Sequence, residues 1–461
     1  MPWCPHETRY GVDAHRTRAA TFPRRSDGHV RAVRPGPTRL VPSHLLRQRG
    51  TTMTTGTGTR EDRTNPGSGE AADAVRPFVL DVPQADLDDL RHRLLRTRWP
   101  DRETVADTTQ GPQLERVQRL VAHWSGAYDW RRAEALLNGW GQFTTRIDGL
   151  DVHFVHVRSR VPGARPLLLT HGWPGSVLEF RHAVGPLTDP EAHGGDPADA
   201  FDVVIPSLPG FGFSGHPTAP GWNLQRTARA WSVLMRRLGY TRWFAQGGDL
   251  GASVTAELAA LHQRNDIGLA GIHLNMALFS PTDDEAAAAD PAEQAMLREG
   301  GYYWQTLSAY SQQMSTRPQT IGYSLTDSPV GLASWIYAMF QDVGGSHDAH
   351  GDVEALFSLD EVLDDVMLYW LPNAAASAAR MYWEMNQVGW ANAGTLEEPL
   401  TVPTGLSVMP GEYVRRSRRW AERRYTDLVH FSEVADGGHF ALLEQPELLV
   451  ADIRSTFLTL R

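Results

Sequence analysis

Short apolar runs, separated by stretches of helical periodicity, dominate the chain from residue 166 onward. The runs cover residues 166–170, 201–205, 242–246, 269–274, 402–408 and 428–431. Buried continuous strands that alternate with helices are typical of a parallel sheet that is covered on both faces. Before them, residues 143–147 and 152–157 alternate between apolar and polar positions around a turn at 148–151, which predicts a β-hairpin. The pattern therefore predicts an α/β fold with a mostly parallel central sheet.

The beginning of the chain predicts a disordered arm. Residues 51–74 are rich in Thr, Gly, Ser, Asp and Glu, which cannot bury enough apolar area to offset the entropy of ordering. The residues before them show no apolar periodicity, and the run 51–55 favours a natural start at or near Met53. We expect the arm to cover residues 1–75, in part upstream of the true start.

A helical extension follows the arm. Leu87, Leu90 and Leu94 recur at helical spacing, and residues 114–124 and 128–137 continue this periodicity. Since the hairpin ends the helical pattern, the segment 76–150 is predicted to be an N-terminal helical region ahead of the sheet.

More than a hundred residues separate the apolar run that ends near residue 274 from the one that begins near residue 402. This segment is rich in Trp, Tyr, Met and Ala and contains no series of strands. An unstructured loop of such length is not expected in a compact domain. We therefore predict a helical cap at 279–399, inserted before the penultimate strand of a core formed by 151–278 and 400–461.

Composition narrows the function. Hydrophobic residues make up 41% of the chain and charged residues 21%, as in a globular protein. The single cysteine, Cys4, excludes an internal disulfide framework and a cysteine-based zinc site. The net charge is −10 although ten Arg lie in residues 1–52, so the body is acidic, which argues against nucleic acid as a partner. No apolar run approaches the roughly 18 residues of a membrane span, and we expect a cytoplasmic protein.

The segment 246–254 carries the clearest chemical signal. An apolar strand runs into Gly-Gly-Asp-Leu-Gly and then into a helix that begins with small residues, which is the pattern of a nucleophile elbow. Asp249 occupies the position of the nucleophile. The chain contains no G-x-S-x-G motif, so a serine esterase would lack its nucleophile.

Two later loops supply the partners of such a nucleophile. Glu412 follows the run that ends at residue 408, where the acid of a triad belongs, and His439 follows the last predicted strand on a loop with two glycines. The order along the chain is Asp249, Glu412, His439, which matches nucleophile, acid and base in α/β-hydrolases.

A loop after the first core strand completes the predicted site. Residues 171–176 read His-Gly-Trp-Pro-Gly-Ser. In this arrangement the backbone N–H groups of Trp173 and Leu250 would form an oxyanion hole. We expect His171 to hold the loop rather than to act on substrate.

Together these segments resemble the microsomal-type epoxide hydrolases of the α/β-hydrolase superfamily. The resemblance extends over residues 76–461 and rests on the motifs at 128–131, 137–138, 143–150, 171–176, 205–214, 247–251 and 437–446. It implies that Asp249 is the nucleophile, His439 the base and Glu412 the acid that orients it. It also implies two cap tyrosines that activate the epoxide, matched here by Tyr302 and Tyr382, with the adjacent Tyr303 as an alternative to the former.

The aromatic, apolar cap favours a small hydrophobic epoxide as substrate beside water, in detoxification or secondary metabolism. The expected reaction requires no metal and no organic cofactor, and a homodimer is possible. Carboxylate chemistry agrees with this reading, because attack by serine on an epoxide would leave a stable ether, whereas a carboxylate leaves an ester that water can cleave. Two alternatives stay open: a haloalkane dehalogenase with the same Asp nucleophile, and a catalytically inactive hydrolase fold that binds a ligand.

Overall fold

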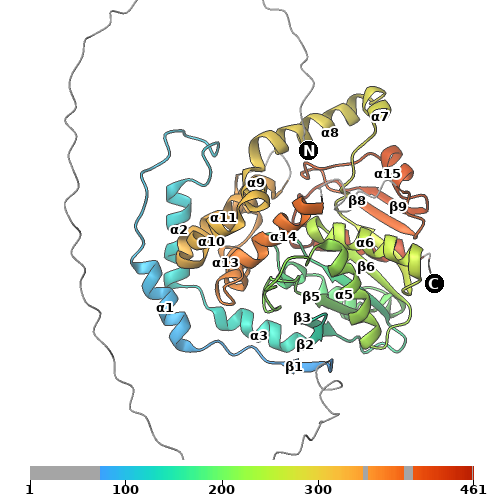
Figure 1. Cartoon of the computed structure of the whole chain (residues 1–461), viewed down its shortest axis with the longest axis horizontal. Helices are drawn as coiled ribbons and strands as arrows, with labels where there is room; N and C mark the ends of the chain where they lie inside the picture. Colours follow the sequence, from blue (N-terminus) through green and yellow to red (C-terminus); the bar gives the residue numbers. More distant parts are fainter. Residues whose placement is uncertain (1–72, 346–350, 389–397, 459, 461) are drawn as a thin grey trace, which may run out of the picture. The chain divides into compact units, whose positions relative to one another are not determined.

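A computed structural model describes residues 73–345, 351–388, 398–458 and 460 (Figure 1). Up to residue 72, the arm predicted over 1–75 lies outside the described residues. At Asp73 the chain already contacts the body, because its carbonyl accepts a hydrogen bond from Thr145 Oγ1 at 3.2 Å and its carboxylate pairs with Arg237 at 3.1 Å.

The described residues form a nine-stranded sheet in the order β1-β2-β3-β5-β4-β6-β7-β8-β9. The strands are β1 (Arg76–Phe78), β2 (Gln142–Ile147), β3 (Leu150–Val157), β4 (Arg165–Thr170), β5 (Phe201–Pro206), β6 (Trp243–Gly247), β7 (Leu269–Leu274), β8 (Thr404–Val408) and β9 (Leu428–Glu433). The pairs from β5 through β9 are parallel, and β1, β2 and β3 join antiparallel. The predicted mostly parallel sheet is confirmed.

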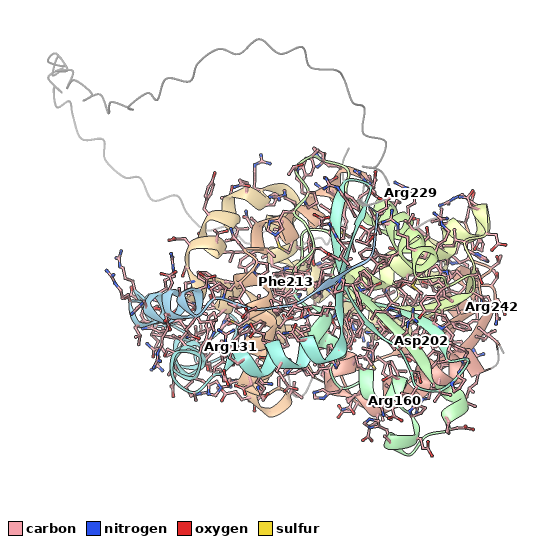
Figure 2. All side chains as sticks on the ribbon, turned by 90° about the horizontal axis from the view of Figure 1, so that it is seen from below. Arg131, Arg160, Asp202, Phe213, Arg229 and Arg242 are labelled. Atoms are coloured by element: carbon pink, nitrogen blue, oxygen red, sulfur yellow. The ribbon has the colours of Figure 1, made fainter. Side chains whose placement is uncertain are left out.

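The hairpin turns more tightly than its sequence predicts. Asp148 and Gly149 both adopt positive φ angles, 51° and 82°, and Leu150 already pairs with Ile147. A two-residue turn of this hand matches the twist of the flanking strands. Phe213, labelled in Figure 2, then packs against Phe78 of β1, with ring centroids 5.4 Å apart, and so fixes the added edge strand.

Helices cover both faces of the sheet. The chain moves from β4 to β5 in one direction and from β5 to β6 and β7 in the other, so right-handed crossovers place α4 opposite α5 and α6. The final helix α17 joins α4, because Arg454 donates to the Pro186 carbonyl at 2.7 Å. The core helices are η1 (Val177–Phe180), α4 (Val184–Thr188), η2 (Glu191–His193), η3 (Pro197–Asp199), α5 (Leu224–Arg237), α6 (Asp249–Asn265), α15 (Arg418–Arg424), α16 (Ala441–Glu444) and α17 (Pro446–Leu458).

The predicted cap lies between β7 and the penultimate strand β8. Its elements are α7 (Asp283–Ala287), α8 (Pro291–Tyr302), the π-helical turn η4 (Tyr303–Leu307), α9 (Ala309–Thr316), α10 (Pro318–Asp327), α11 (Pro329–Val343), α12 (Val353–Leu356), α13 (Leu359–Trp370) and α14 (Ala375–Val388). Figure 1 shows α10, α11 and α13 gathered beside the N-terminal helix α2 (Leu114–Gly126). None of the described helices combines the length and apolar character that a membrane crossing requires.

The N-terminal helices α1 (Gln84–Leu95), α2 (Leu114–Gly126) and α3 (Trp130–Trp140) bind the cap to the core. Asp364 of α13 is the shared contact. Its carboxylate accepts from Arg132 of α3 at 2.8 Å, from Arg181 of the core at 2.7 Å and from the Tyr128 hydroxyl at 2.7 Å. Within the N-terminal region, Arg131, labelled in Figure 2, donates to the Val82 carbonyl at 2.8 Å. One buried carboxylate therefore holds three parts of the structure in place.

Candidate active site

Asp249 stands on a strained turn between β6 and α6. Its φ angle is +49°, in the left-handed region that non-glycine residues rarely adopt. The crowding around it explains the small neighbours, because a Cβ atom on Gly251 would collide with the Thr170 carbonyl of β4. Strain of this kind persists at functional sites where the surrounding packing enforces it. The predicted elbow is present, with Asp249 as the first residue of its helix.

Two backbone N–H groups point at the Asp249 carboxylate. The Trp173 N–H donates to Oδ1 at 2.8 Å, and the Leu250 N–H also helps to stabilise the charged form. Trp173 comes close because β4 lies beside β6, with Thr170 opposite Gly247 at their carboxyl ends. The structure thus brings together the two groups predicted for an oxyanion hole.

His171 holds the loop that carries Trp173. It is buried, its Nδ1 lies 2.9 Å from the Gly172 carbonyl, and its Nε2 accepts from the Leu208 N–H at 3.2 Å. Burial lowers the pKa of His171 to about 4, so the ring is neutral and fits this pair of bonds. These contacts agree with the structural role predicted from the sequence.

His439 lies between the other two predicted residues. Its Nδ1 is 2.7 Å from Glu412 Oε2, and its Nε2 is 3.7 Å from Asp249 Oδ2. The loops after β8 and β9 make this possible, because the Gly411 N–H donates to the Gly437 carbonyl at 2.9 Å. The sheet therefore presents Asp249, His439 and Glu412 in one line at its carboxyl edge.

Burial and charge act in opposition across this line. Burial lowers the pKa of His439, but the Glu412 and Asp249 carboxylates outweigh it and raise that pKa to about 9. Burial raises the pKa of Glu412, and the His439 charge together with two backbone N–H groups brings it below its usual range. Burial also raises the pKa of Asp249, against the His439 charge and the oxyanion N–H groups. The site is built to hold an imidazolium between two carboxylates.

Three cap tyrosines face this cluster. Tyr310 stacks on the Trp173 indole with ring centroids 4.7 Å apart, and Tyr382 meets the same indole edge-on at 6.0 Å. Tyr310 and Tyr382 share a side-chain hydrogen bond, and the Tyr303 hydroxyl lies 2.6 Å from that of Tyr310. Burial raises the pKa of all three phenols well above the usual value, and the Asp249 charge adds to this. All three hydroxyls therefore stay protonated beside the carboxylate.

The prediction of Tyr302 as a cap donor is wrong, whereas Tyr382 lies where it was expected. Tyr302 is 48% exposed, and its ring centroid lies 6.0 Å from that of Tyr413. The reason is the π-helical turn η4, in which the Ser308 N–H reaches back to the Tyr303 carbonyl at 3.0 Å. This turn directs Tyr303 inward and brings Tyr310 beside Tyr382. Tyr310, the single aromatic residue of α9, was missed altogether.

Two family descriptions match the chain in overlapping stretches. "Epoxide hydrolase N terminus" matches residues 75–180, and "alpha/beta hydrolase fold" matches residues 165–315. A Stigmatella aurantiaca protein that carries the name of an epoxide hydrolase is 50% identical over 389 residues, which cover 84% of this chain and 86% of that protein. Epoxide hydrolase 1 of Sus scrofa is 34% identical over 425 residues, covering 84% and 90%. This chain belongs to the epoxide hydrolase family.

Solved structures agree with this assignment. The crystal structure of juvenile hormone epoxide hydrolase from Bombyx mori matches with a TM-score of 0.77 and 27% identity, over 86% of this chain and 97% of that one. The Aspergillus niger epoxide hydrolase matches with a TM-score of 0.73 and 29% identity, over 85% and 98%. The α/β-hydrolase fold and the epoxide hydrolase function predicted from the sequence are confirmed.

The epoxide hydrolase has a cavity of about 1330 Å³ next to this site. Its wall includes Tyr310 at the catalytic end, helix α11 of the cap, and the segment 96–103 of the N-terminal region. A cavity of this size can enclose a substrate of moderate dimensions. Among the described residues, no cluster of His, Cys, Asp or Glu is arranged to hold a metal ion.

One further carboxyl group of the hydrolase lies close to His439. Burial raises the pKa of Glu179 to about 7, and its charge adds to the elevated pKa of His439. The side chain lies against Gly175, where any Cβ atom would collide with it. The motif at 171–176 did not indicate Glu179, because Glu179 lies outside it, in η1. Only the fold brings its side chain against Gly175.

Proposed function

We propose that the enzyme opens a hydrophobic epoxide to a vicinal diol through an ester on Asp249, which water then hydrolyses. One observation supports this above all: protonated phenols of Tyr310 and Tyr382 face a carboxylate that two N–H groups and His439 hold in place. A carboxylate and acids opposite it are the groups that ring opening requires.

In the first step, an Asp249 oxygen attacks one epoxide carbon, and the bond from that carbon to the ring oxygen breaks. The developing alkoxide accepts hydrogen bonds from Tyr310 and Tyr382 and takes a proton from one of them. Because burial keeps both phenols protonated, each can act as donor and acid. Tyr303 supports Tyr310 through the bond between their hydroxyls.

In the second step, His439 removes a proton from water, which attacks the ester carbonyl. Glu412 stabilises the imidazolium, and the N–H groups of Trp173 and Leu250 bind the tetrahedral oxyanion. Collapse releases the diol, whose second hydroxyl takes a proton from His439, and the remaining proton of the water restores the phenol. The balance is one epoxide and one water for one diol.

Tyrosine variants test this assignment against halide release, which needs no proton. Tyr310→Phe and Tyr382→Phe are each expected to slow ester formation by roughly 10- to 1,000-fold, the range for loss of one transition-state donor or acid. Rapid mixing with a styrene-type epoxide measures this step. Binding should weaken less than the rate, because a neutral ring oxygen accepts weaker hydrogen bonds than an alkoxide does.

Tyr302→Phe is the matched control, since it removes the same hydroxyl from an exposed neighbour. It should change the rate by less than about threefold. The assignment fails if the Tyr310 and Tyr382 variants react at the parent rate, or if 1-haloalkanes react faster than every epoxide.

The pH dependence of the second step should differ from the titration of the free enzyme. Formation of the ester removes the Asp249 charge, which helps to raise the pKa of His439 to about 9. The pKa of His439 in the ester should therefore be lower, and ester decay should rise with pH and level off below pH 9. Single-turnover decay rates, compared with an NMR titration of the free imidazole, measure both. Equal pKa values in the two experiments would contradict this electrostatic argument.

The proposed substrate is hydrophobic because much of the cavity wall is apolar, with Leu307, Trp335 and Met339 among its residues. A role in detoxification or secondary metabolism is consistent with such a wall. A cytoplasmic location and a homodimer stay predictions.

A further inference from the structure

One face of α11 forms a wall of the cavity and carries polar side chains that the proposed reaction does not use. Gln341 and Asp342 lie on this wall at the end of the helix that reaches the catalytic loop, where the next carbonyl, that of Val343, accepts the His439 N–H at 3.0 Å. Tyr413, which follows Glu412, lines the same cavity. Burial raises the pKa of Tyr413, and the nearby Asp342 charge adds to this.

Asp342 is the more accessible of the two side chains, and Gln341 supports it from the buried side. Gln341 Nε2 donates to Asp342 Oδ1 at 3.1 Å. Gln341 is only 1% exposed, yet within the described residues its Oε1 has no hydrogen-bond partner. Asp342 is half-buried. Burial raises its pKa to about 6, although the hydrogen bond from the Gln341 side chain lowers it. No Arg or His side chain of the described residues forms an ion pair with it.

Asp327, at the rim of the same cavity, shows what an ordinary surface carboxylate looks like here. Its side chain is 89% exposed, and it lies 3.6 Å from Arg93. The side chain of Asp342 is only partly exposed, and no cation among the described residues pairs with it. Enclosed polar groups without partners cost free energy, and a donor from a bound ligand would remove that cost.

We propose that the Asp342 carboxylate, held in place by Gln341, is a specificity subsite for a hydrogen-bond donor, a hydroxyl or an ammonium group, carried by the epoxide substrate away from its ring. This inference rests on the proposed function and names the substrate class more closely: a largely hydrophobic epoxide with one donor substituent. A pocket built to hydrogen-bond such a group discriminates strongly against the analogue that lacks it.

A matched series of epoxides tests the subsite. Styrene oxides with a methyl, hydroxymethyl or aminomethyl group at the para position, and homologues with the group on longer methylene chains, differ only in the donor. The parent enzyme should show kcat/KM roughly 10- to 100-fold higher for a donor-bearing member than for its methyl counterpart, as for hydrogen bonds to an enclosed carboxylate. Asp342→Leu should bring this ratio close to one.

Two further variants make the result specific. Asp342→Asn keeps the shape and one acceptor, so it should lose the preference for ammonium and keep part of that for hydroxyl. Asp327→Asn removes the same charge from the exposed rim and should leave every ratio unchanged. Circular dichroism and the rate with the methyl epoxide show whether each variant is folded.

The outcomes separate the two levels of the proposal. If no epoxide in the series yields diol, the proposed function itself fails. If the methyl epoxide is hydrolysed but no donor is preferred at any chain length, or if the preference survives Asp342→Leu, the subsite is overturned. A preference that Asp342→Leu removes and Asp327→Asn retains supports it.

Discussion

Asp249→Ala is expected to abolish diol formation, with a loss of about 10⁴-fold or more. The variant keeps the oxyanion N–H groups, His439 and the tyrosines, but it has no atom that can bond to the epoxide carbon. Diol formation from a styrene-type epoxide, followed by chromatography, measures the loss. Mass spectrometry of the protein after the same incubation should show no adduct.

The control for this variant is Asp284→Ala, which removes an exposed carboxylate from α7 and should react at the parent rate. Near-parental activity of Asp249→Ala would remove Asp249 from its role. The same conclusion would follow if a substrate adduct formed on a different carboxylate of that variant.

His439→Gln is expected to lower the turnover rate by roughly 10³-fold or more, while formation of the ester on Asp249 still proceeds. Glutamine can still hydrogen-bond Glu412, but it cannot accept a proton from water. The ester on Asp249 should therefore accumulate to nearly one equivalent. Intact-protein mass spectrometry would show an increase equal to the mass of one epoxide.

Peptide mapping then locates the adduct on Asp249. A variant that neither turns over nor accumulates ester would mean that His439 is also required for alkylation. In that case the division of the reaction into two steps with separate residues would be wrong.

The sequence predicted that the proposed nucleophile, acid and base lie together, because each of them follows a strand. Asp249, Glu412 and His439 each lie within a few residues of an apolar run, and the carboxyl ends of parallel strands meet at one edge of a sheet. The three residues are close in space because of the sheet topology, and the apolar pattern of the sequence predicts that topology. Trp173 and Leu250 follow by the same logic from the adjacency of β4 and β6.

The tyrosines of the cap could not be assigned in this way, because they lie on helices and not after strands. The cap helices have buried and exposed aromatic residues at similar spacing, so periodicity does not tell which tyrosine faces the core. The π-helical turn at Tyr303–Leu307 also shifts the phase of the helix by one residue, which no propensity scale anticipates. This shift accounts for the burial of Tyr303 beside the exposed Tyr302, whereas Tyr310 lies on the next helix, α9, and was not predicted. Tyr382, on the regular helix α14, was found.

The sequence did not predict the polar part of the cavity wall, formed by Gln341 and Asp342, for a related reason. Gln341 and Asp342 end a strongly apolar helix, where polar residues usually mark a solvent-exposed terminus. Only the packing of α11 against the N-terminal region and the catalytic loop encloses them. Short β1 was likewise hidden, because its three residues gain strand geometry only from pairing with β2.

The central claim concerns the new C–O bond that forms when the epoxide opens. Its oxygen comes from Asp249 and not directly from water. A single turnover in H₂¹⁸O, with enzyme in excess over a styrene-type epoxide, tests it most directly. Water attacks the ester carbonyl in this account, so the label should enter the Asp249 carboxylate, and the diol should carry none. The tryptic peptide 243–264 contains Asp249 and would show the increase in mass. An unlabelled peptide together with an ¹⁸O-labelled diol would contradict the covalent mechanism.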